Sequence, residues 1–125
     1  MNDTIFIHGI MVHARHGMAN HEAEVGQRFV VDVELFVALL DASHTDELTD
    51  TVCYADVVRA TLSTFACQNY QLLERAAGAV GDTILATFPR VSAAKVTVHK
   101  PQASIAAIFQ DIGVTINRHR SLVVM

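Results

Sequence analysis

The sequence predicts an α+β domain in which an antiparallel sheet carries two helices on one face, in the element order β-β-α-α-β-β. Two observations predict this class. Apolar residues alternate with a two-residue period near both ends of the chain, and between these regions they recur at helical spacing. A chain of 125 residues has room for one domain. We expect the domain to span residues 1–120, followed by a short apolar tail over 121–125.

The first two strands are expected at 5–15 and 29–37. Ile, Val, Phe and Met dominate residues 5–15, with an expected interruption at Gly9. A polar loop over 17–27 separates them. The second strand has the clearest alternation in the chain, with one face formed by Phe29, Val31, Val33, Leu35 and Val37. Such alternation is typical of a half-buried strand, so the two strands should form an antiparallel pair.

The period changes after the polar residues 41–50, which predict a turn-like connection. A first helix is expected from Tyr54, and its apolar positions are Tyr54, Val58, Leu62 and Phe65, with Val57 beside them. A second helix is expected over about 72–88, and one face of it contains Leu73, Ala76, Ala77, Val80 and Ile84. Pro89 prevents its continuation.

Alternation returns in two further strands. Val96, Val98 and Lys100 share one face of the third, and a fourth is expected around Ile112, Val114 and Ile116. The parity places Lys100 on the core side at the end of its strand. A lysine withdrawn from water can serve as a base or as a Schiff-base nucleophile. The alternative is a strand-end lysine whose amine simply reaches solvent.

Composition excludes several functions. Net charge is −4 and the only lysines are Lys95 and Lys100, so a nucleic-acid partner is not expected. The apolar fraction is 51%, which suggests surface buried against copies of the same chain. Cys53 and Cys67 form no CxxC pair, and the N-terminus lacks a signal-peptide pattern. No apolar run is long enough for a membrane helix. We therefore expect a cytoplasmic protein without a membrane partner.

Several further residues are candidates for chemistry. Glu74 lies in the first turn of the second helix, where the helix dipole favours a carboxylate. The glycines that follow it, Gly78 and Gly81, would allow a close partner or a flat ligand, and a carboxylate can accept two adjacent N–H groups. Glu22 lies in the expected loop, where a glutamate is usually only solvated. Three roles are open for Tyr54: a core residue with its hydroxyl group at the edge, a weak acid, or an aromatic wall on which a ligand stacks.

The histidines do not predict a metal site. The chain has seven of them, but no HxH or HExxH pattern occurs. His13 and His16 are three residues apart on an extended segment, so they should point to opposite faces. No Gly-rich phosphate loop and no GxSxG sequence is present. We expect neither a metal nor a cofactor.

The order of several short motifs resembles that of the dihydroneopterin aldolase family of folate biosynthesis. The opening strand is similar, and the segment with His16-Gly17, Glu22, Glu24 and Gly26-Gln27 resembles the family's HG…E-x-E-x-G-Q loop. The remaining similarities are Thr51–Val57 at a helix start, Leu72-Leu73-Glu74 and His99-Lys100-Pro101. Together they span residues 3–117. Cys53 and the segment Met18–His21 depart from the family pattern and bear on substrate preference.

This resemblance implies a tunnelling fold whose subunits join their sheets into a β-barrel ring, with two tetrameric rings stacked into an octamer. It implies a pterin substrate, 7,8-dihydroneopterin, cleaved without metal into 6-hydroxymethyl-7,8-dihydropterin and glycolaldehyde. By motif, Glu74 and the Leu73 backbone would hold the pterin edge. Tyr54 and the backbone near Val52 would come from a neighbouring subunit. Lys100, Tyr54 and Glu22 would be catalytic, and Glu22 would also contact substrate.

Three alternatives remain open. One is an epimerase acting on dihydroneopterin or its triphosphate, although two lysines equip the chain poorly for a triphosphate. Epimerase activity on the unphosphorylated substrate can also accompany the aldolase reaction. Another is a non-catalytic pterin-binding ring protein, against which Lys100 and Tyr54 argue. The third is a zinc pterin synthase of the same fold, which the missing HxH pattern disfavours.

Overall fold

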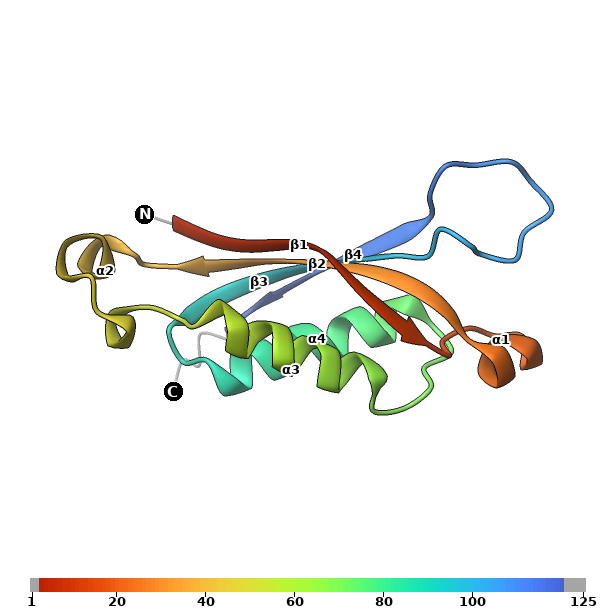
Figure 1. Ribbon diagram of the computed structural model, residues 1–125, viewed down its shortest axis with the longest axis horizontal. Helices are drawn as coiled ribbons and strands as arrows, with labels where there is room; N and C mark the ends of the chain where they lie inside the picture. The colour runs from red at the N-terminus through yellow and green to blue at the C-terminus, as the bar shows by residue number, and fades with distance from the viewer. Residues whose placement is uncertain (1–2, 121–125) are drawn as a thin grey trace.

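A computed structural model describes residues 3–120. It has two layers, a four-stranded antiparallel sheet and a pair of helices on one of its faces (Figure 1). The strands follow one another in the sheet in sequence order, and they are β1 (Asp3–Ala14), β2 (Gln27–Val37), β3 (Val91–His99) and β4 (Gly113–His119). The long helices are α3 (Tyr54–Ala66) and α4 (Leu73–Thr87). The predicted α+β class and element order are confirmed. The expected tail over 121–125 lies outside the described residues.

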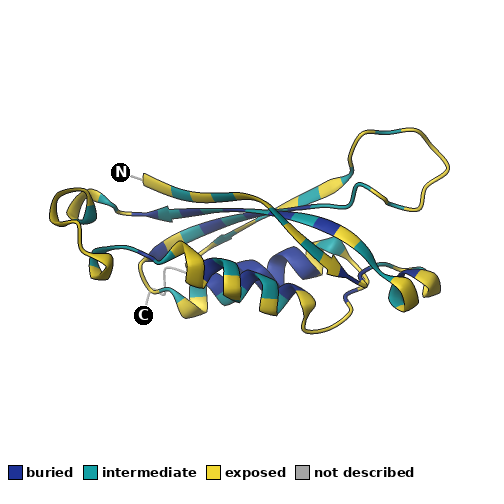
Figure 2. Cartoon of the chain, in the orientation of Figure 1, coloured by how far each residue is buried: buried dark blue, intermediate teal, exposed yellow. Residues whose placement is uncertain are grey.

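The inner face of β2 forms the centre of the core. Its five predicted apolar residues are buried, and β2 pairs with β1 on one side and β3 on the other. Inward residues of β3 complete the apolar layer beneath the helices, and these are Val91, Ala94, Val96 and Val98. The buried residues run along the sheet face and the inner sides of the helices, while the outer edges stay exposed (Figure 2).

The predicted interruption of β1 at Gly9 is confirmed. The pairing changes register between Ile7 and Ile10, and Gly9 has a φ of 80°. This conformation suits glycine because it has no Cβ. The freed Gly9 amide donates to Asp32 Oδ1 of β2 at 2.7 Å, so the bulge is held by a side chain of the neighbouring strand.

Two segments expected to be loops contain short helices. Residues 17–27 include α1 (Asn20–Val25). Most of 41–50 is occupied by α2 (Leu40–Thr45), which begins one residue earlier, and by the 3-10 turn η1 (Leu48–Asp50). Each is too short to show an amphipathic period, so its polar composition resembles that of a loop. Local backbone geometry ends these helices. Asp46, for example, terminates α2 in the left-handed conformation with a φ of 57°.

The buried stripe of α3 differs from the prediction. Val57, Thr61 and Phe65 are its fully buried residues, whereas Tyr54 is 68% exposed. The predicted stripe is therefore wrong at its first residue and correct at Phe65. On α4 the predicted face is confirmed, with Leu73 partly buried and Ala76, Ala77, Val80 and Ile84 buried.

The glycines of α4 contact a side chain of this same chain. A Cβ at Gly78 would lie 2.6 Å from the guanidinium of Arg118 on β4, and one at Gly81 would lie 2.9 Å from its Cγ. Arg118 Nε donates to Asp82 Oδ1 at 2.9 Å. The two glycines thus make room for Arg118, so of the two expected neighbours, a close partner or a flat ligand, this chain supplies the close partner.

Gly81→Ala should destabilise the protein, although alanine favours a helix over glycine by about 1 kcal/mol. The new methyl group would press on the stem of Arg118, and overpacking of this kind costs about 1–3 kcal/mol. In an Arg118→Ala background the same change should become stabilising. Gly78→Ala is the matched control, because only the flexible guanidinium tip must move there. Chemical denaturation of the wild-type protein and these four variants measures the differences, and a loss of stability that persists without Arg118 would contradict the explanation.

Candidate active site

Lys100 follows β3 directly and forms a buried ion pair with Glu22. Its parity is as predicted, because Val96 and Val98 on the same side are fully buried. Lys100 Nζ lies 2.5 Å from Glu22 Oε2, and the two side chains are only 12% and 7% exposed. Charges removed from water this far require close pairing and further hydrogen bonds.

Glu22 receives those further hydrogen bonds. The Ala19 amide donates to Oε1 at 3.1 Å, and Gln27 Nε2 donates to Oε2 at 3.3 Å. Burial alone would raise the pKa of Glu22, but the bond from Lys100 and the Ala19 N–H outweigh it, so its pKa lies below the ordinary value. The expectation of a solvated loop glutamate is wrong, because α1 turns the side chain inward.

Gly17 makes space for this carboxylate. A Cβ at position 17 would overlap the carboxyl group of Glu22. The backbone there has a φ of 148°, which few other residues adopt. Its amide donates to the Tyr70 carbonyl at 2.9 Å, which ties the segment before α1 to the segment before α4.

His16 joins the same segments from within the core. It is fully buried, with Nε2 2.8 Å from the Phe65 carbonyl, and its Nδ1 accepts the Tyr70 amide at 3.0 Å. These bonds require the neutral tautomer protonated at Nε2. Burial is the main cause that lowers the pKa of His16, and the charge of Lys100 lowers it further. As predicted, His13 and His16 differ in environment, since His13 is exposed. His16 therefore holds the segment before α1 against the end of α3 and the segment before α4. Its residue type alone did not predict this role, whereas the His16-Gly17 motif could have indicated it.

The start of α4 lies at this end of the molecule. Leu73 packs against the core, while Glu74 is exposed in the first helical turn. Within the described residues, the Glu74 carboxylate has no hydrogen-bond or ion-pair partner. It is therefore free to accept two donors from a ligand.

Val52 and Tyr54 lie at the opposite end of α3. Tyr54 is its first residue, and Phe65, which contacts His16, is eleven positions later, so about 16 Å of helix separates them. A cavity of about 440 Å³ is lined there by Ile5, Leu48, Thr51, Val52, Cys53, Tyr54 and Ala55. Figure 1 shows α1, the helix that contains Glu22, at one end of the molecule and α2 at the opposite end, on the side where α3 begins with Tyr54. One protomer brings Glu22, Lys100 and the start of α4 together but leaves Tyr54 apart.

Across residues 3–120, no group of three or more His, Cys, Asp or Glu side chains is arranged to hold a metal ion. In the same part of the chain, no helix has the length and apolarity needed to cross a membrane.

Comparison with known proteins identifies the family. The profile described as FolB, dihydroneopterin aldolase, matches residues 5–117. The chain belongs to the dihydroneopterin aldolase family. A dihydroneopterin aldolase of Methylorubrum extorquens is 36% identical over 97% of this chain and 93% of its own. These matches confirm the resemblance drawn from the motifs.

Solved structures of dihydroneopterin aldolases have the same fold as this chain. A FolB protein of Vibrio cholerae is similar with a TM-score of 0.87 at 30% identity, over 94% of this chain and 98% of its own. The Escherichia coli dihydroneopterin aldolase, solved in complex with neopterin, has a TM-score of 0.84 at 28% identity, over 93% of this chain and 98% of its own. The fold is that of this family, and the chain is an enzyme, a lyase with dihydroneopterin aldolase activity in folate biosynthesis.

The Glu22–Lys100 pair should stabilise the fold in a pH-dependent way. Because the pKa of Glu22 is lowered on folding, its contribution is present above the pKa of an unfolded glutamate and is lost as pH falls through the folded value. Glu22→Gln should cost on the order of 3 kcal/mol near neutral pH, because it leaves the ammonium group without a counter-charge. Its stability should also fall less steeply with acid.

Denaturant titrations at several pH values measure both effects. Glu24→Gln is the matched control, since Glu24 is exposed two residues away. A double variant, Glu22→Gln with Lys100→Met, should lose less than the sum of the single losses. Additive losses would show that the two groups do not stabilise each other.

Proposed function

We propose that the chain cleaves 7,8-dihydroneopterin by a metal-independent retro-aldol reaction, at a site completed by a second copy of the chain. The products are 6-hydroxymethyl-7,8-dihydropterin and glycolaldehyde. The observation that carries the proposal is the buried Lys100–Glu22 pair, at the same end of the molecule as the unpartnered carboxylate of Glu74.

Glu74 and the Leu73 backbone hold the amino-pyrimidinone edge of the pterin in this proposal. That edge presents two adjacent N–H donors, which a carboxylate accepts in a bidentate manner. The position of Glu74 in the first turn of α4 supports this role, because the amino-terminal end of a helix dipole favours a carboxylate. Glu22 contacts the side chain of the substrate near Lys100.

Cleavage requires a base at the 2′-hydroxyl group. In the reacting state the amine of Lys100 is neutral, and acting through a water held by Glu22 it removes this proton while the C1′–C2′ bond breaks and glycolaldehyde leaves. The electron pair moves into the N5=C6 imine of the substrate, and Lys100 assists protonation at N5. Gln27 supports a water at this place. Its Oε1 atom is buried without a partner in the described part of the chain, and its Nε2 already binds Glu22.

Tyr54 of the second copy supplies the later proton. The enol intermediate must be protonated at C1′ to restore the imine, and a phenol O–H can donate this proton. The exposure of Tyr54, together with the length of α3 that separates it from the Phe65–His16 contact, supports its entry from another subunit. The backbone near Val52 contributes to the same half of the site.

The assembly we propose is an octamer of two stacked tetrameric rings, in which the sheets join into a barrel. Two features support association. Strands β1 and β4 form the edges of the described sheet, and β1 exposes Phe6 and Met11 by 63% and 65%. Unpaired edges with apolar side chains favour pairing with another chain. We also propose a cytoplasmic location, in which Cys53 and Cys67 stay reduced.

Product analysis with 7,8-dihydroneopterin tests the reaction. Lys100→Ala should lower kcat by about 10²–10⁴-fold, as expected for lost acid–base catalysis, and should leave the Kd of the pterin product nearly unchanged. Glu74→Ala should chiefly weaken product binding. The proposed reaction fails if the wild-type protein releases no glycolaldehyde, and release of only the 2′-epimer would favour the epimerase alternative.

Mixed oligomers test the shared site. Lys100→Ala and Tyr54→Phe each damage one half, so co-refolding equal amounts should restore about a quarter of the wild-type sites if subunits assemble at random. Glu22→Gln mixed with Lys100→Ala is the matched control. Both changes lie in the same half, so no activity should return. Failure of the first mixture to recover activity, with mixed oligomers verified by mass spectrometry, would show that Tyr54 does not act on a neighbour's Lys100.

A further inference from the structure

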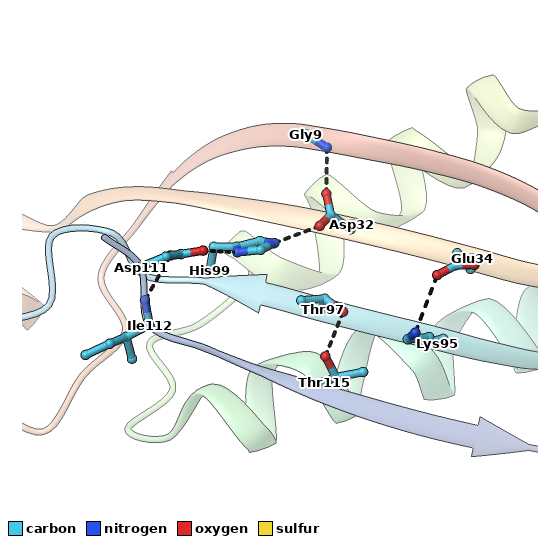
Figure 3. A network of polar contacts seen from close by, with 9 residues as sticks. All are labelled: Gly9, Asp32, Glu34, Lys95, Thr97, His99, Asp111, Ile112 and Thr115. Carbon is cyan, nitrogen blue, oxygen red and sulfur yellow. Dashed lines mark hydrogen bonds and ion pairs between the residues drawn. The ribbon is translucent and has the colours of Figure 1, made fainter. Parts of the chain in front are cut away.

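The outer face of the sheet carries a polar network that includes His99, the residue before Lys100 in the sequence (Figure 3). His99, the last residue of β3, lies between two carboxylates. Its Nε2 is 2.7 Å from Asp32 Oδ2 on β2, and its Nδ1 is 2.5 Å from Asp111 Oδ2 in the segment before β4. Asp32 in turn accepts the amide of the Gly9 bulge on β1. One imidazole therefore connects three strands and the start of the fourth.

We propose that His99 is a positioning residue for Lys100: clamped between Asp32 and Asp111, it closes the base of segment 100–112 and fixes the backbone from which Lys100 reaches Glu22. This inference rests on the proposed function in one respect, the catalytic role of Lys100. Asp32, His99 and Asp111 are called the clamp below.

The backbone at the base of this segment is closed by short hydrogen bonds. The Lys100 amide donates to the Ile112 carbonyl at 2.6 Å, and the Ile112 amide donates to Asp111 Oδ1 at 2.9 Å. The pairing of β3 with β4 begins directly beyond it, at His99 and Gly113. Most residues of the segment 101–111 are exposed, including Ile108. Apart from the bonds at its base, little tertiary packing therefore fixes this segment.

Strand alternation couples the clamp to the active site. Successive residues of an extended chain point to opposite faces, so His99 faces solvent while Lys100 turns toward the helices and Glu22. A tilt of the peptide between them would move both side chains. Holding His99 from two sides therefore limits the positions available to the amine of Lys100.

The charge of the clamp depends on His99. Two hydrogen bonds to carboxylates require a proton on each ring nitrogen, which is the imidazolium form. The bond to Asp32 is the main cause that raises the pKa of His99, burial opposes it, and Asp111 raises it further. Burial would raise the pKa of Asp32, but His99 and the Gly9 amide lower it, with His8 of β1 adding to the effect.

The sign of the pH dependence follows from the raised pKa. The full clamp exists below the ordinary pKa of histidine, and it is lost as pH rises through the folded value for His99. The same face also carries Arg28 and Glu34 of β2, Lys95 of β3, and the titratable side chains of His8, His13 and His119. Of these, Glu34 and Lys95 pair with each other at 3.7 Å farther along the sheet. This second pair supplies a control on the same strands (Figure 3).

Asp111→Asn and His99→Leu test the proposal, and Lys95→Met is the matched control. Asp111→Asn should lower kcat by about 10–100-fold, as expected for a misplaced catalytic group, with little change in KM or melting temperature. The basic limb of its kcat–pH profile should move to lower pH, because His99 loses one carboxylate. NMR titration of the His99 ring should show the same shift. Lys95→Met should leave all of these unchanged.

The decisive comparison uses Lys100→Ala as the background. If His99 acts through Lys100, His99→Leu should reduce kcat in the wild-type background and cause no further reduction in Lys100→Ala. An equal loss in both backgrounds would overturn the proposal, as would a wild-type kcat–pH profile in Asp111→Asn. Full activity of Lys100→Ala itself would instead refute the proposed function.

Discussion

The buried ion pair between Lys100 and Glu22 is the interaction on which the rest of this end of the molecule depends. Two charges so far removed from water are stable only if each is oriented and the carboxylate has further donors. The Ala19 amide and Gln27 supply those donors, the absence of a side chain at Gly17 provides the space, and α1 sets the direction of Glu22. His16 then holds the segment before α1 against the end of α3. The local structure of residues 16–27 is thus explained largely by the need to place one carboxylate beside one amine.

The end of β3 serves both faces of the sheet. Lys100 belongs to the inner face, where a low dielectric strengthens its interaction with Glu22. His99 belongs to the outer face, where its two ring nitrogens bond to the carboxylates of Asp32 and Asp111. Neighbouring residues of one strand end therefore have opposite electrostatic environments. His16 and His99 show the same contrast. Burial without a carboxylate lowers the pKa of His16, and the two carboxylates raise the pKa of His99.

The sequence predicted the long periodic strands and helices. It did not predict short helices, or side-chain contacts between residues far apart in the chain. The alternation of β2 predicted its buried face, and the parity of β3 predicted the inward direction of Lys100, because both follow from the two-residue repeat of a strand. Glu22 was expected to be solvated because six residues of α1 are too few to display a period. Tyr54 has the helical spacing of the apolar stripe, and its role as a core residue, a weak acid or a stacking wall stayed open; within residues 3–120 its side chain is left exposed. The clamp around His99 depends on pairing between residues 67 and 12 positions apart, and no local pattern encodes that pairing.

A rigid helix separates the two halves of the proposed site. The distance from Tyr54 to the His16 contact is fixed by the rise of α3, and no rotation of a tyrosine side chain spans about 16 Å. The halves therefore meet only when a second copy places its own Tyr54 near Lys100. Association on this scale requires apolar surface, and β1 exposes such surface at the edge of the sheet. In the proposed assembly, the high apolar content of so small a domain has the same physical origin as the exposure of Tyr54, because both belong to surface that a second copy would cover.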